Sequence, residues 1–354
     1  MATPSPTQQI ADEIQSLQSK VGDLQASVRL TKARDNIEDI QSTVNILTQR
    51  IASLRTRGYV FEKDLENQAQ GFVKTWTLLY PNLQSQLNIQ SSGLQNSLRP
   101  IESQLQQLTA SARNPVVART LLGTTQNTTR VLEDKVSAAE RAIEGMYDQV
   151  SNQVSQYTRH LDEIEYLLTQ LEQATFQLLP TEAGISAAKA VWCKTGKEQK
   201  GDPEGILFLT DQRILFEQKE EIVTKKVLFV ATEKQKVQQL QLECPVVLVE
   251  KIDTSKEGFL KNEDHIEIRF ASGAAVEVAH FHIWQDNSTW QQLVNRAKSK
   301  DFDKDRAIGI DQSTLDKVKS APSQCPSCGG NITQVLLRGM DSINCEYCGF
   351  VIRL

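Results

Sequence analysis

Four of the six cysteines form two Cys-x2-Cys pairs close to the C-terminus, with sixteen residues between the pairs. Two pairs at this spacing are typical of a site in which four thiolates hold one tetrahedral Zn2+ ion. A glycine follows the second cysteine of each pair and can adopt the positive φ that such a turn favours. The spacing therefore predicts a zinc site with the ligands Cys325, Cys328, Cys345 and Cys348.

This zinc is expected to be structural, with one ion per chain. Four thiolates fill the tetrahedral shell and leave no position for water or substrate, which argues against a catalytic zinc. Two disulfides are the alternative, and the lack of a readable secretory signal argues against them because the cytosol is reducing. Residues 333–337 and a turn at 338–342 would supply a hairpin between the pairs, and the segment is similar to zinc ribbons of the rubredoxin-knuckle type. About 30 residues bury too little core alone, so the metal would supply the folding energy.

The ribbon offers little positive charge to a nucleic acid. Within residues 325–354 only Arg338 and Arg353 are cationic, against Asp341 and Glu346. The whole chain has a formal net charge of -5. Because nucleic-acid affinity comes largely from neutralised phosphates, a nucleic-acid partner is the least favoured of the alternatives.

Other residues that could do chemistry form weaker patterns. His280 and His282 alternate along an expected strand and so share a face, but no third ligand lies near them in the sequence, which favours ordinary surface or edge positions. Cys193 and Cys244 have no histidine or paired cysteine beside them and are expected to be small buried apolar residues. The sequence contains no phosphate loop, dinucleotide fingerprint, nucleophile elbow or paired-histidine zinc helix, so we expect no enzyme.

Residues 1–182 are expected to form a helical coiled-coil rod or bundle. Apolar residues recur there at alternating intervals of four and three, which is the seam of a heptad repeat. One seam covers residues 10–28, a second covers 37–54, and a third covers 143–171. The skip near Thr31 indicates a stutter within one continuous helix.

Glycine and proline divide this region further. Gly58 suits a helix C-terminus, while Pro81 and Pro115 suit helix starts. Two long helices are therefore predicted, over about 8–56 and 116–178, with shorter helices between them. Their seams must be buried either within one chain or by self-association.

Residues 184–300 change to short runs of β-branched and aromatic residues separated by turn residues. Seven strands are predicted, which suits an antiparallel sandwich or barrel. They cover 188–194, 205–210, 213–218, 227–231, 246–252, 265–270 and 275–282. Asp286 or Ser288 is then a candidate N-cap for an amphipathic helix that contains Trp290 and Val294.

The segment GILFLTDQRILF, residues 205–216, resembles the strand-turn-strand signature of GRAM domains, which belong to the pleckstrin-homology-like (PH-like) superfold. The matching positions are Gly205, Leu207, Leu209, Thr210, Arg213 and Phe216. The resemblance covers residues 184–300 and implies a β-barrel closed by a C-terminal helix. The matching residues shape a hairpin and carry no catalytic chemistry.

Pleckstrin-homology domains often gather cations for phosphoinositides in the loop between their first two strands. Here that loop contains Lys194, Lys197 and Lys200, and Lys225 and Lys226 could lie nearby. These five lysines are the candidate lipid-binding residues. Solvated surface is the alternative, because lysines gather on turns for solubility and an acidic neighbour dilutes this cluster.

The chain is therefore predicted to be multidomain α plus β. We expect a non-enzymatic cytoplasmic scaffold or adaptor that joins protein partners, since the longest apolar runs are too short to span a membrane. The alternative is a peripheral membrane adaptor whose β-domain binds anionic lipid. The expected parts are a helical coiled coil or bundle over 1–182, a GRAM/PH-like β-domain over 184–300, a linker over 301–322 and a zinc ribbon over 323–354.

Overall fold

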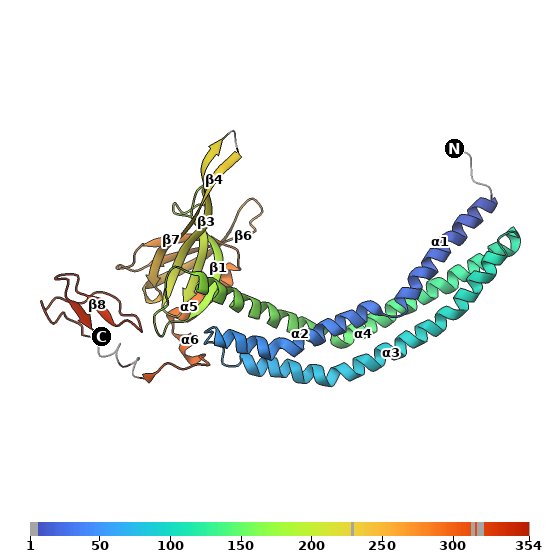
Figure 1. Ribbon diagram of the computed structural model, residues 1–354, viewed down its shortest axis with the longest axis horizontal. Helices are drawn as coiled ribbons and strands as arrows, with labels where there is room; N and C mark the ends of the chain where they lie inside the picture. The colour runs from blue at the N-terminus through green and yellow to red at the C-terminus, as the bar shows by residue number, and fades with distance from the viewer. Residues whose placement is uncertain (1–5, 228–229, 313–315, 317–321, 354) are drawn as a thin grey trace. The chain divides into compact units, whose positions relative to one another are not determined.

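The computed structural model describes residues 6–227, 230–312, 316 and 322–353. The chain divides into two compact units, residues 1–48 with 67–158 and residues 49–66 with 159–354. Long helices make up the first unit, whereas the second contains helix ends, a sheet and a small C-terminal segment (Figure 1).

Four helices supply the first unit, and their heptad seams face one shared core. They are α1 (Pro6–Ser27), α2 (Thr31–Thr56), α3 (Leu65–Ala110) and α4 (Pro115–Gln173). Ile14, Ile37 and Leu87 are at most 5% exposed in this core. Trp76 of α3 is also buried, and its indole N–H donates to Gln41 Oε1 of α2 at 2.9 Å. The predicted helical bundle is confirmed, and self-association stays a prediction.

The continuous helix predicted over 8–56 is wrong. The chain leaves the helix at residues 28–30, where Leu30 has a φ of +54°. Leu30 is nevertheless fully buried, so its side chain fills the core while the backbone changes direction. Burial in the core offsets the cost of this left-handed conformation. The skip in the heptad pattern therefore marks the break between α1 and α2.

Pro81 does not begin a helix, because α3 continues through it. Proline removes one N–H from the helical ladder, but buried Trp76 and Leu83 on either side keep the helix packed in the core. Pro115 does begin α4, as predicted.

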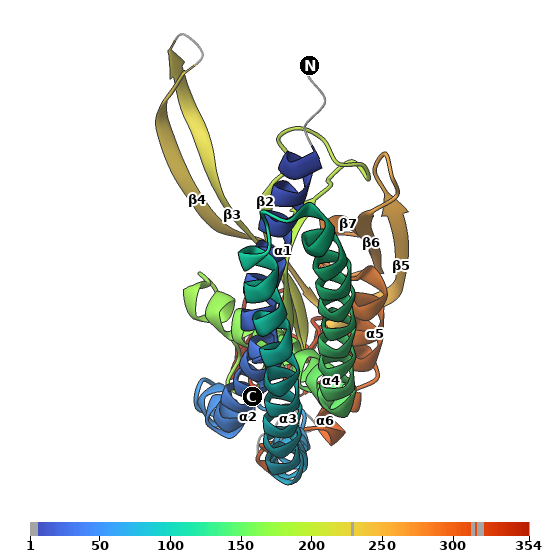
Figure 2. The same ribbon diagram turned by 90° about the vertical axis from the view of Figure 1, so that its right-hand side faces the viewer.

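The second unit contains a seven-stranded antiparallel sheet with the order β4-β3-β2-β1-β7-β6-β5. Its strands are β1 (Gly184–Trp192), β2 (Glu204–Thr210), β3 (Arg213–Val227), β4 (Val230–Pro245), β5 (Val249–Glu257), β6 (Glu263–Phe270) and β7 (Val278–Ile283). Figure 2 shows β3 and β4 as a long hairpin that projects from the sheet. Among the described strands β4 and β5 form the two edges, so the predicted closure into a barrel remains a prediction.

Strand β4 departs most from the sequence expectation. The strand predicted over 227–231 is divided, since β3 ends at Val227 and β4 begins at Val230, while residues 228–229 lie outside the described residues. The sequence of β4 is rich in lysine and glutamine and gives little strand signal. Its pairing along β3, with Leu242 opposite Phe216, stabilises it as a strand.

Helix α5 (Asn287–Lys298) follows β7 and packs on β5 and β6. The side chain of Asp286 caps it by accepting the N–H of Thr289 at 2.8 Å. Trp290 and Val294 are fully buried beneath it. The predicted amphipathic helix is therefore confirmed, with Asp286 as its N-cap.

The loop between α2 and α3 packs against the segment that follows α5. Phe61 is fully buried, and its ring centroid lies 5.2 Å from that of Phe302 in α6 (Asp301–Lys304). The N–H of Ala307 donates to Val60 O at 2.8 Å. The guanidinium group of Arg306 lies 5.0 Å from the centroid of the Phe61 ring. Apolar and cation–π contacts therefore join two segments that are far apart in the sequence.

A buried ion cluster lies at the turn between β2 and β3. The side chain of Asp211 is 3% exposed and binds the guanidinium groups of Arg306 and Arg338. The carboxylate also accepts the N–H of Ala183 at 3.0 Å. Burial raises the pKa of Asp211, while this N–H and the two guanidinium groups act in the opposite direction. Because Arg338 belongs to the C-terminal segment, the cluster fastens that segment to the sheet.

Candidate functional site

The four predicted zinc ligands come together in the C-terminal segment. The Sγ atoms of Cys325, Cys328, Cys345 and Cys348 all lie within 4.8 Å of one another. The Sγ–Sγ distance is 3.7 Å from Cys325 to Cys348 and 3.6 Å from Cys328 to Cys345. A tetrahedral zinc with Zn–S bonds of about 2.3 Å holds its sulfurs about 3.8 Å apart. The donor set and its spacing therefore fit Zn2+.

Two turns of the same design present these cysteines. The N–H of Gly329 donates to Cys325 O at 2.8 Å, and the N–H of Gly349 donates to Cys345 O at 2.9 Å. Both glycines have a φ of +73°, where a residue with a Cβ is strained. The predicted need for glycine after the second cysteine of each pair is confirmed.

The electrostatics of the four thiols favour a cation between them. Backbone N–H groups of Cys348 and Tyr347 help to lower the pKa of Cys345 to about 7. The N–H of Gly330 lowers the pKa of Cys328, but hydrogen bonds with the other thiols outweigh it and raise that pKa to about 12. Ionisation of one thiol therefore disfavours ionisation of its neighbours. A divalent cation between them would allow all four to ionise.

A small apolar core lies beside the thiols. Strands β8 (Ser342–Asn344) and β9 (Val351–Arg353) pair antiparallel, with buried Ile343 opposite buried Ile352. The hairpin predicted over 333–342 is wrong, because residues 333–337 are irregular. Leu336 and Met340 instead pack against the apolar core from this irregular segment.

The lysines proposed for lipid binding do not form a purely basic surface. Lys194, Lys197 and Lys200 are exposed in the loop between β1 and β2, as predicted. Residues 194–204 also contain three acidic residues, so the three lysines are neutralised within the loop. Lys225 and Lys226 lie near the end of β3, and their side chains are outside the described part of the chain.

The expectation of surface positions for the paired histidines is wrong. His280 and His282 of β7 are 8% and 9% exposed. A third histidine, His265 of β6, lies directly opposite His282 in the sheet. Burial lowers the pKa of His265, and the two neighbouring histidines act in the same direction. The sequence shows three histidines on two neighbouring strands, but the strand register that brings them together depends on the folded sheet.

The two isolated cysteines behave as small apolar residues, as predicted. Cys193 is 1% exposed and Cys244 is fully buried. Burial raises the pKa of Cys193 to about 11, and it also raises the pKa of Cys244. Both side chains are therefore thiols at neutral pH and poor nucleophiles.

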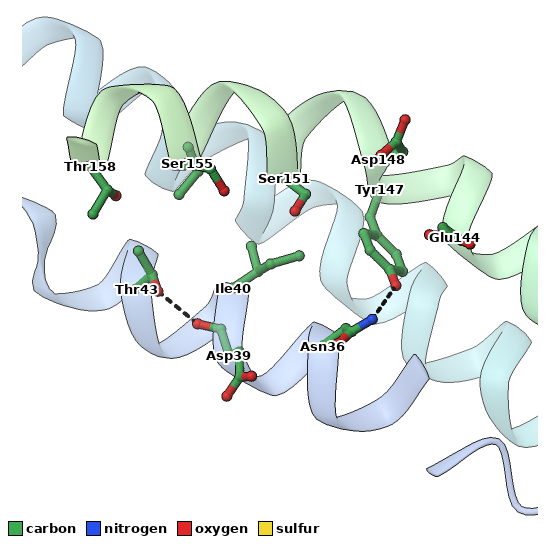
Figure 3. Close-up of a pocket in the computed structure, with 11 residues that line it drawn as sticks. Asn36, Asp39, Ile40, Thr43, Glu144, Tyr147, Asp148, Ser151, Ser155 and Thr158 are labelled. Carbon is green, nitrogen blue, oxygen red and sulfur yellow. Dashed lines mark hydrogen bonds between the residues drawn. The ribbon is translucent and has the colours of Figure 1, made fainter. Parts of the chain in front are cut away.

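A polar groove of about 450 Å³ runs between α2 and α4 in the first unit. Figure 3 shows Asn36 and Tyr147 facing each other across it, with Asn36 Nδ2 donating to Tyr147 Oη at 3.3 Å. Asp39, Glu144 and Asp148 also line this groove. Its lining residues include no histidine, cysteine or lysine, so the groove offers acidic and hydroxyl groups without a nucleophile–base pair.

Comparisons with known proteins identify no family for this chain. No protein-family model matches the sequence, and no curated protein matches it significantly. Among solved structures the chain is similar to the DH/PH domains of p115-RhoGEF, at 12% identity and a TM-score of 0.21. That match covers 84% of this chain and 95% of the other, and a TM-score this low identifies no common fold. No helix in the described part of the chain is long and apolar enough to cross a membrane.

Proposed function

We propose that the protein is a non-enzymatic adaptor that binds protein partners through a GRAM/PH-like sheet domain, a structural zinc ribbon and a helical bundle. The observation that carries this proposal is the strand order β4-β3-β2-β1-β7-β6-β5 followed by α5. A seven-stranded antiparallel sheet followed by one helix agrees with the GRAM/PH-like domain that the resemblance of residues 205–216 implies.

The partner surface on the second unit is proposed at a hollow of about 340 Å³ that both apolar and charged residues line. Val247, which precedes β5, and Phe302 of α6 line one side, and Leu336 and Leu337 line it from the ribbon. Val247 is 58% exposed at its rim. Apolar side chains of the sheet domain and of the ribbon would then form one binding surface. The ribbon would thus take part in partner binding.

The substitution Val247→Asp tests this surface in the full-length chain. Because the Val247 side chain is exposed, the substitution should change the stability of the fold little. A charge in the apolar contact should abolish cross-linking to the partners of the wild-type protein. Val278→Asp is the matched control, because Val278 is 49% exposed and lies outside the hollow. Equal cross-linking by both variants would refute the assignment of the surface.

The thiolate cluster is proposed to hold one structural zinc ion. When bound, the ion would supply folding energy to a segment with only four buried apolar or thiol side chains in its core. Its ligands are Cys325, Cys328, Cys345 and Cys348, and a closed shell of four sulfurs provides no position for substrate.

Metal analysis after dialysis against a weak chelator should give one zinc per chain. Cys345→Ser should lose this zinc and make the C-terminal segment sensitive to protease, whereas Cys244→Ala, which removes a thiol outside the cluster, should keep it. A Cys345→Ser variant that retains one zinc and its protease resistance would contradict the proposal.

A second candidate function is peripheral membrane binding, and one observation favours it. Phe259 is 101% exposed and Leu260 is 75% exposed at the tip of the turn between β5 and β6. Lys261 follows them, and Lys256 precedes them but pairs with Asp264 at 2.5 Å. Exposed apolar side chains beside a basic residue suit the interface of an anionic bilayer, where burial of one phenylalanine contributes about 1.5–3 kcal/mol.

Sedimentation of the full-length chain with anionic vesicles tests this candidate. Phe259→Asp should weaken binding about 10–100-fold, which follows from that burial energy. A second variant, with alanine at Lys194, Lys197 and Lys200, tests the lipid-binding surface that was predicted from the sequence. Loss of sedimentation in the lysine variant alone would favour the loop between β1 and β2, and no sedimentation of the wild-type chain at low salt would exclude the membrane function.

A further inference from the structure

A second cluster of metal-ligating side chains lies on the sheet, apart from the thiolates. His265 of β6 and His282 of β7 are direct cross-strand partners, so their side chains leave the sheet on one face. Their rings stack with 4.7 Å between centroids and 13° between planes. Glu198, from the loop between β1 and β2, and Glu263, the first residue of β6, complete the cluster. Donor atoms of all four residues lie within 4.8 Å of one another.

One donor atom in this cluster is buried and has no hydrogen-bond partner. It is Nε2 of His265, whose side chain is 1% exposed. Glu263 Oε2 lies 3.9 Å from it, which is too far for a hydrogen bond. A buried polar atom without a partner costs free energy. A metal ion between the two groups would satisfy both the nitrogen and the carboxylate.

The neighbouring histidine orients His265 for this role. His265 Nδ1 and His280 Nε2 are 3.0 Å apart. If His265 Nδ1 carries the proton and donates it, Nε2 keeps the lone pair that a metal needs. Nδ1 of His280 then faces Glu267 Oε2 at 3.8 Å. A metal-ligating histidine commonly donates its other N–H to such an outer partner, which fixes the ring.

The cluster is also open to solvent on one side. A hollow of about 390 Å³ is lined by Glu198, Glu263 and His282 together with Asp202 and Glu204. Four carboxylates surround it, against one lysine among its lining residues. The negative charge favours entry of a cation, and the hollow supplies a path to the donor atoms.

We propose that Glu198, Glu263, His265 and His282 form a second metal site that takes an exchangeable divalent transition-metal ion of the Zn2+ type. Two imidazole nitrogens and two carboxylate oxygens are a donor set that suits Zn2+ and disfavours Ca2+ and Mg2+, which prefer oxygen alone. Closure of the site would tie the loop between β1 and β2 to β6 and β7. The hydrogen bond from His282 Nδ1 to Glu198 Oε2, 2.6 Å long, is the contact that the ion would replace or bridge.

Calorimetric titration of Zn2+ into the full-length chain tests the site after one equivalent of zinc has filled the thiolates. One further ion should bind, and an equal concentration of Mg2+ should not compete with it. The Cys345→Ser variant, which lacks a thiolate ligand, should still bind an ion at the sheet site. The outcome is therefore independent of the zinc ribbon.

Two substitutions locate the ion. Loss of even an outer partner of a ligand typically lowers metal affinity about 10–100-fold. Loss of a ligand itself, in His282→Ala or Glu198→Gln, should therefore lower the affinity at least tenfold. Glu198 is 42% exposed in a loop, and its variant keeps the sheet intact. His160→Ala is the matched control, because His160 is the one histidine outside the sheet.

Two results would overturn the proposal. One is the absence of a second binding event in the wild-type chain. The other is a loss of affinity in Cys193→Ser with none in Glu198→Gln. Donor atoms of Cys193, His265 and His280 also lie within 4.8 Å of one another, and that second result would place the ion among these three residues.

Discussion

The substitution Asp211→Asn should loosen the attachment of the C-terminal segment to the sheet. It keeps the shape of the side chain and removes the charge that neutralises Arg306 and Arg338. The side chains of these two arginines are 7% and 13% exposed, so two guanidinium groups would be left buried. Removal of one partner from a buried ion pair costs about 3–5 kcal/mol.

The lower end of that range applies here. Asp303 lies 3.2 Å from Arg338 and 3.7 Å from Arg306, and it can retain part of the compensation. A loss of about 3 kcal/mol corresponds to roughly a hundredfold faster amide exchange. The assay is native-state hydrogen exchange at Val246, whose N–H donates to Gln212 O beside the cluster at 2.8 Å.

Asp303→Asn is the matched control for this measurement. Its side chain is 35% exposed, so its removal should change exchange by less than about tenfold. The reasoning is wrong if Asp211→Asn exchanges at Val246 no faster than this control, because the cluster would then contribute nothing to the attachment.

Two further predictions concern pH and backbone packing in the second unit. The carboxylates of Glu163 and Glu62 raise the pKa of His160 to about 10. This contribution to stability should be complete below about pH 6.5, the ordinary pKa of histidine, and should disappear as the pH rises through 10. Since the His160 side chain is 41% exposed, the effect should be about 1 kcal/mol, and denaturant unfolding of His160→Gln should lack it. Gly205→Ala would place a Cβ 1.9 Å from a backbone carbonyl oxygen of β3 and should lower the free energy of unfolding by about 1–3 kcal/mol. Gly22→Ala, with nothing within 4 Å of the new Cβ, should not destabilise the chain, and equal effects of the two substitutions would contradict this argument.

The helical core was predictable because burial follows the heptad period. Every apolar residue of the two N-terminal seams, from Ile10 to Val28 and from Ile37 to Leu54, is at most 9% exposed. Helix ends were not predictable from that period. Residue 173 ends α4, five residues before the expected end. The backbone N–H and the hydroxyl of Thr175 both donate to the Glu217 carboxylate at 2.6 Å, and this contact comes from a distant strand.

The two metal-ligating clusters differ in how far the sequence reveals them. The thiolate cluster is local, since each pair of cysteines is set by one turn of four residues. The histidine cluster needs the register of β6 against β7 and the path of the loop that contains Glu198. A shift of that register by one residue would turn His265 to the opposite face. The thiolate cluster can therefore be predicted from spacing along the chain, whereas the histidine cluster can be found only in the tertiary structure.

The contact between Phe61 and Phe302 has a consequence for the order of synthesis. Close to these two rings, the ammonium group of Lys63 donates a hydrogen bond to the backbone oxygen of Lys304 at 3.2 Å. These two residues are 241 positions apart in the chain. At a ribosomal rate of about 5–20 residues per second, the loop between α2 and α3 emerges about 10–50 s before its partner exists. Throughout that interval the aromatic ring of Phe61 lacks its contacts with Phe302 and Arg306. A nascent chain therefore exposes part of the Phe61 side chain until Phe302 has been made, and a chain that stops before residue 302 cannot form this contact.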